Sequence, residues 1–217
     1  MTETIKALDY WPMVPHGKIQ CFHYKDAGPQ LDTNVFATMP DMHSLFVWDQ
    51  DATSLLYVDY DKDMKWKDTW YIRHRIGKGL EEWRDDNIIE KSDWKTKIFG
   101  NRNKIVFRDD YPIRWGDVVE LGKIYTNNPK SNFFSCNPPQ LLNGTQSFCY
   151  QQRIAEFNGY KDVVTLIYNQ AWGNNNGGAK YWMAKGVGPV AVQWITRQGD
   201  KVITTNRMDA TVTWRDG

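Results

Sequence analysis

Short segments in which apolar and polar residues alternate follow one another along almost the whole chain, with turn-forming residues between them. Alternation at every second position is the pattern of a β-strand that buries one face. It is clear in residues 65–76, where Trp66, Asp68, Trp70 and Ile72 share one face and mostly polar residues occupy the other. We expect the first face to turn toward a core or a ligand. The segments with strand character are 17–24, 44–48, 54–60, 65–76, 96–108, 118–125, 146–157, 162–168, 181–185, 187–197, 201–205 and 210–214.

Turn residues predict how these segments connect. Asp49-Gln50-Asp51 separates two apolar runs, which indicates a hairpin. Asn158-Gly159 tolerates the positive φ of a tight primed turn, so the strands that end at Phe157 and begin at Tyr160 should pair antiparallel. Gln198-Gly199-Asp200 turns between two of the last four segments, which we expect to form a meander.

Helix signals are few. Residues 79–91 would hold a short helix around Leu80 and Trp83, but the apolar spacing there is poor. The chain is therefore predicted to be all-β and predominantly antiparallel, with little helix. At 217 residues it could form one domain or two, and β-domains of this length are commonly single, so we expect one domain over residues 1–217.

Composition and charge exclude some classes of function. Lysine and arginine total 27 and aspartate and glutamate total 26, so the formal charge of +1 gives no global field that would attract nucleic acid. No run of about 18 apolar residues exists, so no membrane-spanning helix is expected. The Met1-Thr2-Glu3-Thr4 start lacks the features of a signal peptide.

Three cysteines, Cys21, Cys136 and Cys149, allow one disulfide. Cys136 and Cys149 flank a turn-rich segment whose ends could meet, and a bridge there would stabilise the fold by roughly 3 kcal/mol. Such a bridge would indicate a periplasmic or extracellular protein. The alternative is that all three are reduced, buried thiols that act as small apolar residues.

Residues 181–190, YWMAKGVGPV, resemble the "wyAkGvGlVk" signature near the end of a broad group of secreted bacterial β-proteins and lipoproteins. Shorter segments at 10–13, 111–117 and 159–163 are similar to other parts of that group. The resemblance implies a single strongly curved antiparallel sheet, a half-barrel or barrel-like meander akin to lipoprotein-localisation and lipocalin-like domains. It also implies a secreted or periplasmic protein, often without known enzyme activity, and it transfers no catalytic residue. Pro189 departs from the pattern.

Gly186 and Gly188 have a physical explanation without any family. Glycines two apart in a strand remove side chains where the strand bends or where another backbone or ring comes close. The alternative is that a ligand approaches the bare backbone there.

Motifs for catalysis and cofactor binding are missing from the sequence. It contains no nucleophile elbow and no phosphate-binding glycine loop, and its histidines, His16, His23, His43 and His74, are scattered singly. We therefore expect no cofactor and no metal site. Paired carboxylates from Glu81, Glu82 and Asp85 remain the candidates for a carbohydrate-active hydrolase or lyase, which would need two acids about 5–10 Å apart.

The aromatic content favours binding over catalysis. Eleven tryptophans and eleven tyrosines are difficult to bury completely, and indole rings stack on the apolar faces of sugars while polar side chains bind the hydroxyls. A glycan is therefore the first ligand class predicted. The candidate ligand-binding residues are Trp66, Asp68, Trp70, Trp83 and Trp182.

Two other kinds of binding remain open. A lipid or other amphiphile would occupy an apolar cavity, as in lipocalin-like barrels. A secreted toxin would contact membranes through exposed aromatic side chains. A glycan binder should carry an exposed row of coplanar rings, an amphiphile binder a dry cavity, and a hydrolase a close pair of carboxylates in a cleft.

Overall fold

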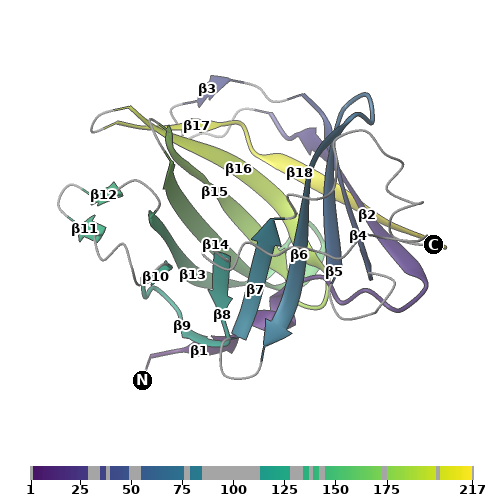
Figure 1. Cartoon of the computed structure of the whole chain (residues 1–217), viewed down its shortest axis with the longest axis horizontal. Helices are drawn as coiled ribbons and strands as arrows, with labels where there is room; N and C mark the ends of the chain where they lie inside the picture. Colours follow the sequence, from purple (N-terminus) through teal and green to yellow (C-terminus); the bar gives the residue numbers. More distant parts are fainter. Residues whose placement is uncertain are drawn as a thin grey trace.

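The computed structural model describes residues 2–28, 35–37, 40–48, 55–75, 79–84, 113–127, 134–136, 139–141, 145–172, 175–198 and 201–216. This part of the chain is all-β, as predicted, and its helical content is one turn of 3-10 helix, η1 (Ala7–Tyr10) (Figure 1). The strands are β1 (Thr4–Lys6), β2 (Lys18–Asp26), β3 (Val35–Ala37), β4 (Met42–Trp48), β5 (Leu55–Asp61), β6 (Trp66–Arg75), β7 (Gly79–Arg84), β8 (Ile113–Gly116), β9 (Val118–Glu120), β10 (Tyr125–Asn127), β11 (Phe134–Cys136), β12 (Pro139–Leu141), β13 (Thr145–Phe157), β14 (Tyr160–Trp172), β15 (Asn175–Ala184), β16 (Gly188–Gln198), β17 (Lys201–Thr205) and β18 (Met208–Asp216).

One large sheet contains most of these strands, in the order β10-β13-β14-β15-β16-β18-β2-β4-β5-β6-β7-β8. Neighbours along this path pair antiparallel, and the parallel pair in the sheet is β17 with β3. The C-terminal strand β18 lies beside β2 over its whole length, which joins the two halves of the chain in one sheet. Small two-stranded sheets are formed by β1 with β9 and by β11 with β12.

The predicted hairpins are confirmed where the structure describes them. Strands β4 and β5 pair antiparallel from Trp48 opposite Leu55. Strands β13 and β14 pair from Phe157 opposite Tyr160, and Asn158 and Gly159 between them have φ values of 50° and 82°. Positive φ at both central residues is what a primed turn requires. The segment 96–108, for which strand character is predicted, lies outside the described residues.

Three local expectations are corrected. Gly79–Arg84 is strand β7, paired with β6 and β8, where a short helix was considered. Residues 118–125 are divided between β9 and β10, which belong to different sheets. The C-terminal segments do not form a simple meander, because β18 pairs with β16 and β2 while β17 pairs with the far end of β16. A long strand such as β16 can pair with different partners along its two halves.

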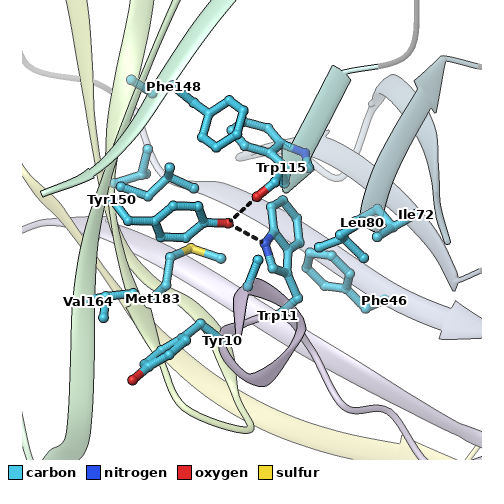
Figure 2. Close-up of a cluster of buried hydrophobic side chains, with 14 of the residues drawn as sticks. Tyr10, Trp11, Phe46, Ile72, Leu80, Trp115, Phe148, Tyr150, Val164 and Met183 are labelled. Atoms are coloured by element: carbon cyan, nitrogen blue, oxygen red, sulfur yellow. Dashed lines mark hydrogen bonds between the residues drawn. The ribbon is translucent and has the colours of Figure 1, made fainter. Parts of the chain in front are cut away.

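The main hydrophobic core lies on one face of the large sheet, called the core face below, where η1 and Trp11 pack (Figure 2). The hydroxyl of Tyr150 on β13 links two tryptophans of this core by hydrogen bonds. It donates a hydrogen bond of 3.1 Å to the backbone oxygen of Trp115 and accepts one of 3.4 Å from Nε1 of Trp11. Other members are Phe22, Phe46, Ile72, Leu80, Phe148, Val164, Leu166 and Met183.

Side chains from the two ends of the strand path meet in this core. Trp115 on β8 packs against Phe148 on β13 and Tyr168 on β14, with ring centroids 6.0 and 5.5 Å apart. Among the described residues no strand pairing joins β8 to β10, so the sheet is open. The opposite face carries a smaller cluster that includes Val163, Trp182 and Val190.

Candidate functional site

Of the predicted ligand-binding residues, the two whose side chains are described, Trp70 and Trp182, lie on opposite faces of the sheet. The backbones of Trp66, Asp68 and Trp83 lie in β6 and β7, but their side chains are outside the described residues. Trp70 is half-buried and packs against the main core. Trp182 belongs to the cluster on the opposite face and is only 9% exposed.

The surroundings of Trp182 show what covers it. Its ring stacks on Phe157 with centroids 5.6 Å apart, and the charged groups of Lys180 and Arg207 lie 5.0 and 5.7 Å from the indole. Cations over aromatic rings are attracted by the ring quadrupole. Side chains of the same chain therefore cover this indole ring.

Glu81 and Glu82 are consecutive residues of β7, and both are buried. Successive side chains of a strand point to opposite faces of the sheet, so these two carboxylates do not face one substrate. Glu82 lies on the core face, where its Oε2 accepts a hydrogen bond of 2.8 Å from Nε1 of Trp115. Asp85 lies outside the described residues.

The structure describes one partner of the predicted Cys136–Cys149 disulfide. Cys149 is a free thiol there, as is Cys21, and the side chain of Cys136 is outside the described residues. Burial raises the pKa of both free thiols, which favours the protonated form over the thiolate. In the described part of the chain, no group of three or more metal-ligating side chains is placed to hold an ion.

An apolar pocket of about 530 Å³ opens between the segment that follows η1 and the ends of β4 to β7. This volume lies in the range of about 300–1,000 Å³ typical of small-molecule sites. Two indoles, Trp11 and Trp48, form part of its wall, and Arg73 and His74 supply the charged or titratable side chains. The other lining residues are Leu8, Pro12, Met13, Val14, Pro15, Leu55, Ile72 and Leu80.

The segment from Trp11 to Pro15 is fixed at both ends. The backbone N–H of Trp11 donates to the backbone oxygen of Leu8, and Nε1 of Trp48 donates to the backbone oxygen of Val14. Pro12 and Pro15 restrict the backbone between these anchors because their φ is fixed. Met13, by contrast, is 56% exposed and lies at the pocket mouth.

Few polar groups reach the pocket. His74 Nε2 lies 3.5 Å from Oδ1 of Asp117, and Arg73 stands opposite Glu81 across the β6–β7 pair. The positive and polar groups of the pocket, Arg73 and His74, therefore lie together on β6, and the rest of the wall is apolar. Such a site suits a molecule with an apolar body and a small polar end.

A second feature of the core face is a group of five side chains, called the tyrosine cluster below: Tyr57, Asp59, Glu82, Tyr168 and Tyr181. The three tyrosines are half-buried and pack against the main core. Tyr57 stacks on Phe46 with centroids 4.6 Å apart, and Oγ of Ser44 donates to Oδ1 of Asp59 at 2.6 Å.

The tyrosines of this cluster are in a desolvated, negative environment. Burial is the main cause that raises the pKa of Tyr57, Tyr168 and Tyr181. The charges of Asp59 and Glu82 raise the pKa of Tyr57 and Tyr181 further, and that of Glu82 also acts on Tyr168. Both carboxylates therefore contribute to the electrostatic environment of phenols on distant strands.

Neither the pocket nor the tyrosine cluster is among the sites predicted from the sequence. The apolar residues and two prolines in segment 10–15 were a signal for the pocket wall, since they are too apolar for an ordinary surface loop. The tyrosine cluster had no local signal, because its members come from β5, β7, β14 and β15.

Comparison of the chain with protein-family models, curated proteins and solved structures finds no match in any of the three. Within the described residues, no helix has the length and apolar character needed to cross a membrane.

Proposed function

We propose that this protein binds a small apolar or amphiphilic molecule in the pocket between residues 11–15 and strands β4 to β7. The observation that carries the proposal is the pocket itself, whose wall is formed mainly by aliphatic, proline and indole side chains. An apolar ligand that leaves water for such a wall gains about 25 cal/mol for each Å² of buried apolar surface. A polar end would lie near His74 and Arg73.

This proposal includes a shape for the sheet. The contacts of Trp115 with Phe148 and Tyr168 connect the two ends of the strand path, which supports a half-barrel wrapped around the core. A curved, open sheet of this kind leaves room for a pocket beside the core. An exported location and a role in glycan recognition remain predictions from the sequence.

The glycan prediction has less support. Trp214 is the indole that is classed as exposed among the described side chains, and one ring does not make a row of coplanar platforms. The enzyme alternative needs a pair of carboxylates from Glu81, Glu82 and Asp85. Glu81 and Glu82 point to opposite faces of β7, and Asp85 lies outside the described residues. We therefore favour binding of an amphiphile over either alternative.

Titration with N-phenyl-1-naphthylamine tests the proposal, because this apolar probe fluoresces when it leaves water. The variant Met13→Glu places a charge at the pocket mouth, and we expect it to weaken probe binding about tenfold, since an unpaired carboxylate beside an apolar site is costly. Met64→Glu is the matched control, because Met64 is also exposed but does not line the pocket.

Equal affinities for wild type and Met13→Glu would refute the pocket as the binding site. A glycan array screened in parallel with the same protein addresses the competing prediction. Strong glycan binding together with no probe binding would replace an amphiphile by a sugar as the ligand.

A further inference from the structure

The tyrosine cluster combines strands that are far apart in the sheet. Tyr57 and Asp59 lie on β5, and Tyr181 lies on β15, with β16, β18, β2 and β4 between these two strands in the strand order. Tyr57 and Tyr181 nevertheless pack against the same hydrophobic core, and Asp59 is on the face of β5 that carries Tyr57. Side chains from these two parts of the sheet therefore meet on the core face.

A direct chain of contacts links the remaining members. Nε1 of Trp115 donates to Glu82, and the ring of the same tryptophan packs edge-on against Tyr168, with centroids 5.5 Å apart. Glu82 is on the core face together with Ile72, its partner across the β6–β7 pair, and Tyr57 shares that face. Trp115 thus connects the carboxylate of Glu82 on β7 with the phenol ring of Tyr168 on β14.

The accessible surface of the phenols shows that they are not sealed inside the core. Tyr57, Tyr168 and Tyr181 are half-buried by exposed area, whereas Phe46 and Leu166, which pack in the same core, are almost completely buried. Part of each phenol ring therefore stays accessible to solvent, so that a small molecule can contact it.

The chemistry of this surface selects for positive charge. Aromatic faces attract ammonium groups through the ring quadrupole, and the attraction grows when water is excluded. Carboxylates beside the rings add a Coulomb term that a neutral molecule of the same shape does not receive. Tyrosine hydroxyls with a raised pKa stay neutral and available as hydrogen-bond partners.

We propose that the tyrosine cluster is a second binding site and that its ligand is a small organic cation, an amine or a quaternary ammonium ion. Asp59 and Glu82 supply the opposite charge, and Tyr57, Tyr168 and Tyr181 supply the aromatic surface. The site is separate from the apolar pocket, because none of its five members lines that pocket.

Isothermal titration calorimetry with tetramethylammonium, choline and benzylamine tests this proposal. The neutral control for choline is 3,3-dimethylbutan-1-ol, which has the same shape without the charge. We expect at least one of the cations to bind, with an affinity that falls as salt rises, and the alcohol to bind at least tenfold more weakly. If no cation binds more tightly than the alcohol, the proposal is wrong.

Variants assign the binding to the cluster. Asp59→Asn and Glu82→Gln keep the side-chain shape and are each expected to weaken cation binding about tenfold. Tyr181→Leu removes a ring and should also weaken binding, while Tyr181→Phe keeps the ring and should retain most of it. Tyr160→Leu is the matched control, because Tyr160 is also half-buried but packs on the opposite face.

N-phenyl-1-naphthylamine affinity is measured on the same variants to show that each is folded and that the apolar pocket is intact. Cation binding that is lost in Asp59→Asn and Glu82→Gln, with unchanged probe binding, would support the second site independently of the first. Unchanged cation affinity in both carboxylate variants would refute it. Loss of probe binding in Met13→Glu has no bearing on this outcome, so the two proposals fail separately.

Discussion

The indole of Trp115 donates a 2.8 Å hydrogen bond to the carboxylate of Glu82, and both side chains are almost completely buried. A buried carboxylate is costly unless it is hydrogen-bonded or paired. The indole therefore does two things in the core: it fills space against Phe148 and Tyr168, and it stabilises the charge of Glu82. This couples β7 and β8 to the far end of the sheet.

The substitution Trp115→Phe is expected to destabilise the protein by about 3 kcal/mol, because it removes both aromatic volume and the donor to Glu82. Urea unfolding followed by circular dichroism measures the change.

The double variant Trp115→Phe with Glu82→Gln provides the control. An amide costs less than a carboxylate to bury without this donor, so the Trp115→Phe penalty should be smaller by about 1–2 kcal/mol in the Glu82→Gln background. Strictly additive penalties would contradict the coupling.

The hydroxyl of Tyr150 gives a second prediction. It bonds Trp115 as a donor and Trp11 as an acceptor, so Tyr150→Phe should leave both partners unsatisfied in the core. We expect a loss of about 1–3 kcal/mol in the free energy of unfolding. Tyr160→Phe should change it by less than about 0.5 kcal/mol, since water can reach a half-buried hydroxyl. A loss of equal size in both variants would indicate that the Tyr150 hydrogen bonds contribute nothing specific.

The two glycines of segment 181–190 should respond differently to alanine. Both have positive φ, 71° at Gly186 and 108° at Gly188. A Cβ at Gly186 would meet open space, while one at Gly188 would lie 2.7 Å from Cγ of Pro12. Gly186→Ala is therefore expected to cost about 1–2 kcal/mol, from backbone strain alone, and Gly188→Ala clearly more.

Pro12 also lines the apolar pocket, so Gly188→Ala should weaken N-phenyl-1-naphthylamine binding while Gly186→Ala leaves it unchanged. Thermal unfolding and probe titration on the same samples check both effects. Equal destabilisation by the two substitutions would show that the proline ring moves aside without cost. The ring contact also explains why a glycine is needed here, as predicted for a strand position that another ring or backbone approaches closely.

Local features of the fold were predictable from the sequence, and long-range ones were not. The Asn158-Gly159 turn defines its own hairpin, because the two residues accept the required positive φ and the flanking strands are adjacent in the chain. Nothing in the alternation of residues indicates that β18 pairs with β2, or that β16 divides its partners between β17 and β18. The period of two predicts which residues of a strand share a face, but it does not predict which strand pairs with it.

The same limit applies to the candidate sites. Tyr57 and Asp59 were recognisable as two positions on one strand face, but Glu82 and Tyr181 join them only through the folding of the sheet. Glu81 and Glu82 are separated from each other for a local reason. Once residues 79–84 are identified as a strand, the period of two itself separates the two carboxylates.

The ion pair between Asp162 and Arg153 predicts how stability depends on pH. The carboxylate oxygens of Asp162 accept hydrogen bonds from Nε and Nη2 of Arg153 at 2.6 and 2.7 Å, and a third from the hydroxyl of Tyr10 at 2.8 Å. Hydrogen bonding to Arg153 is the main cause that lowers the pKa of Asp162 below its usual value. A carboxyl whose pKa is lower in the folded state stabilises that state above the unfolded pKa of about 4, and this contribution is lost as pH falls through the folded value.

The variant Asp162→Asn tests this dependence, because asparagine tolerates the positive φ of 53° at this position but carries no charge. We expect wild type to be more stable than the variant at pH 7 and 5, with the difference shrinking between pH 4 and 3. The matched control is Asp216→Asn, because Asp216 also pairs with a cation, Lys18, but its side chain is 85% exposed and solvent screens the pair. Urea midpoints at each pH measure the effect. A wild-type advantage that persists unchanged at pH 3, or one that Asp216→Asn reproduces, would show that the charge of Asp162 does not hold the β13–β14 hairpin to the N-terminal segment.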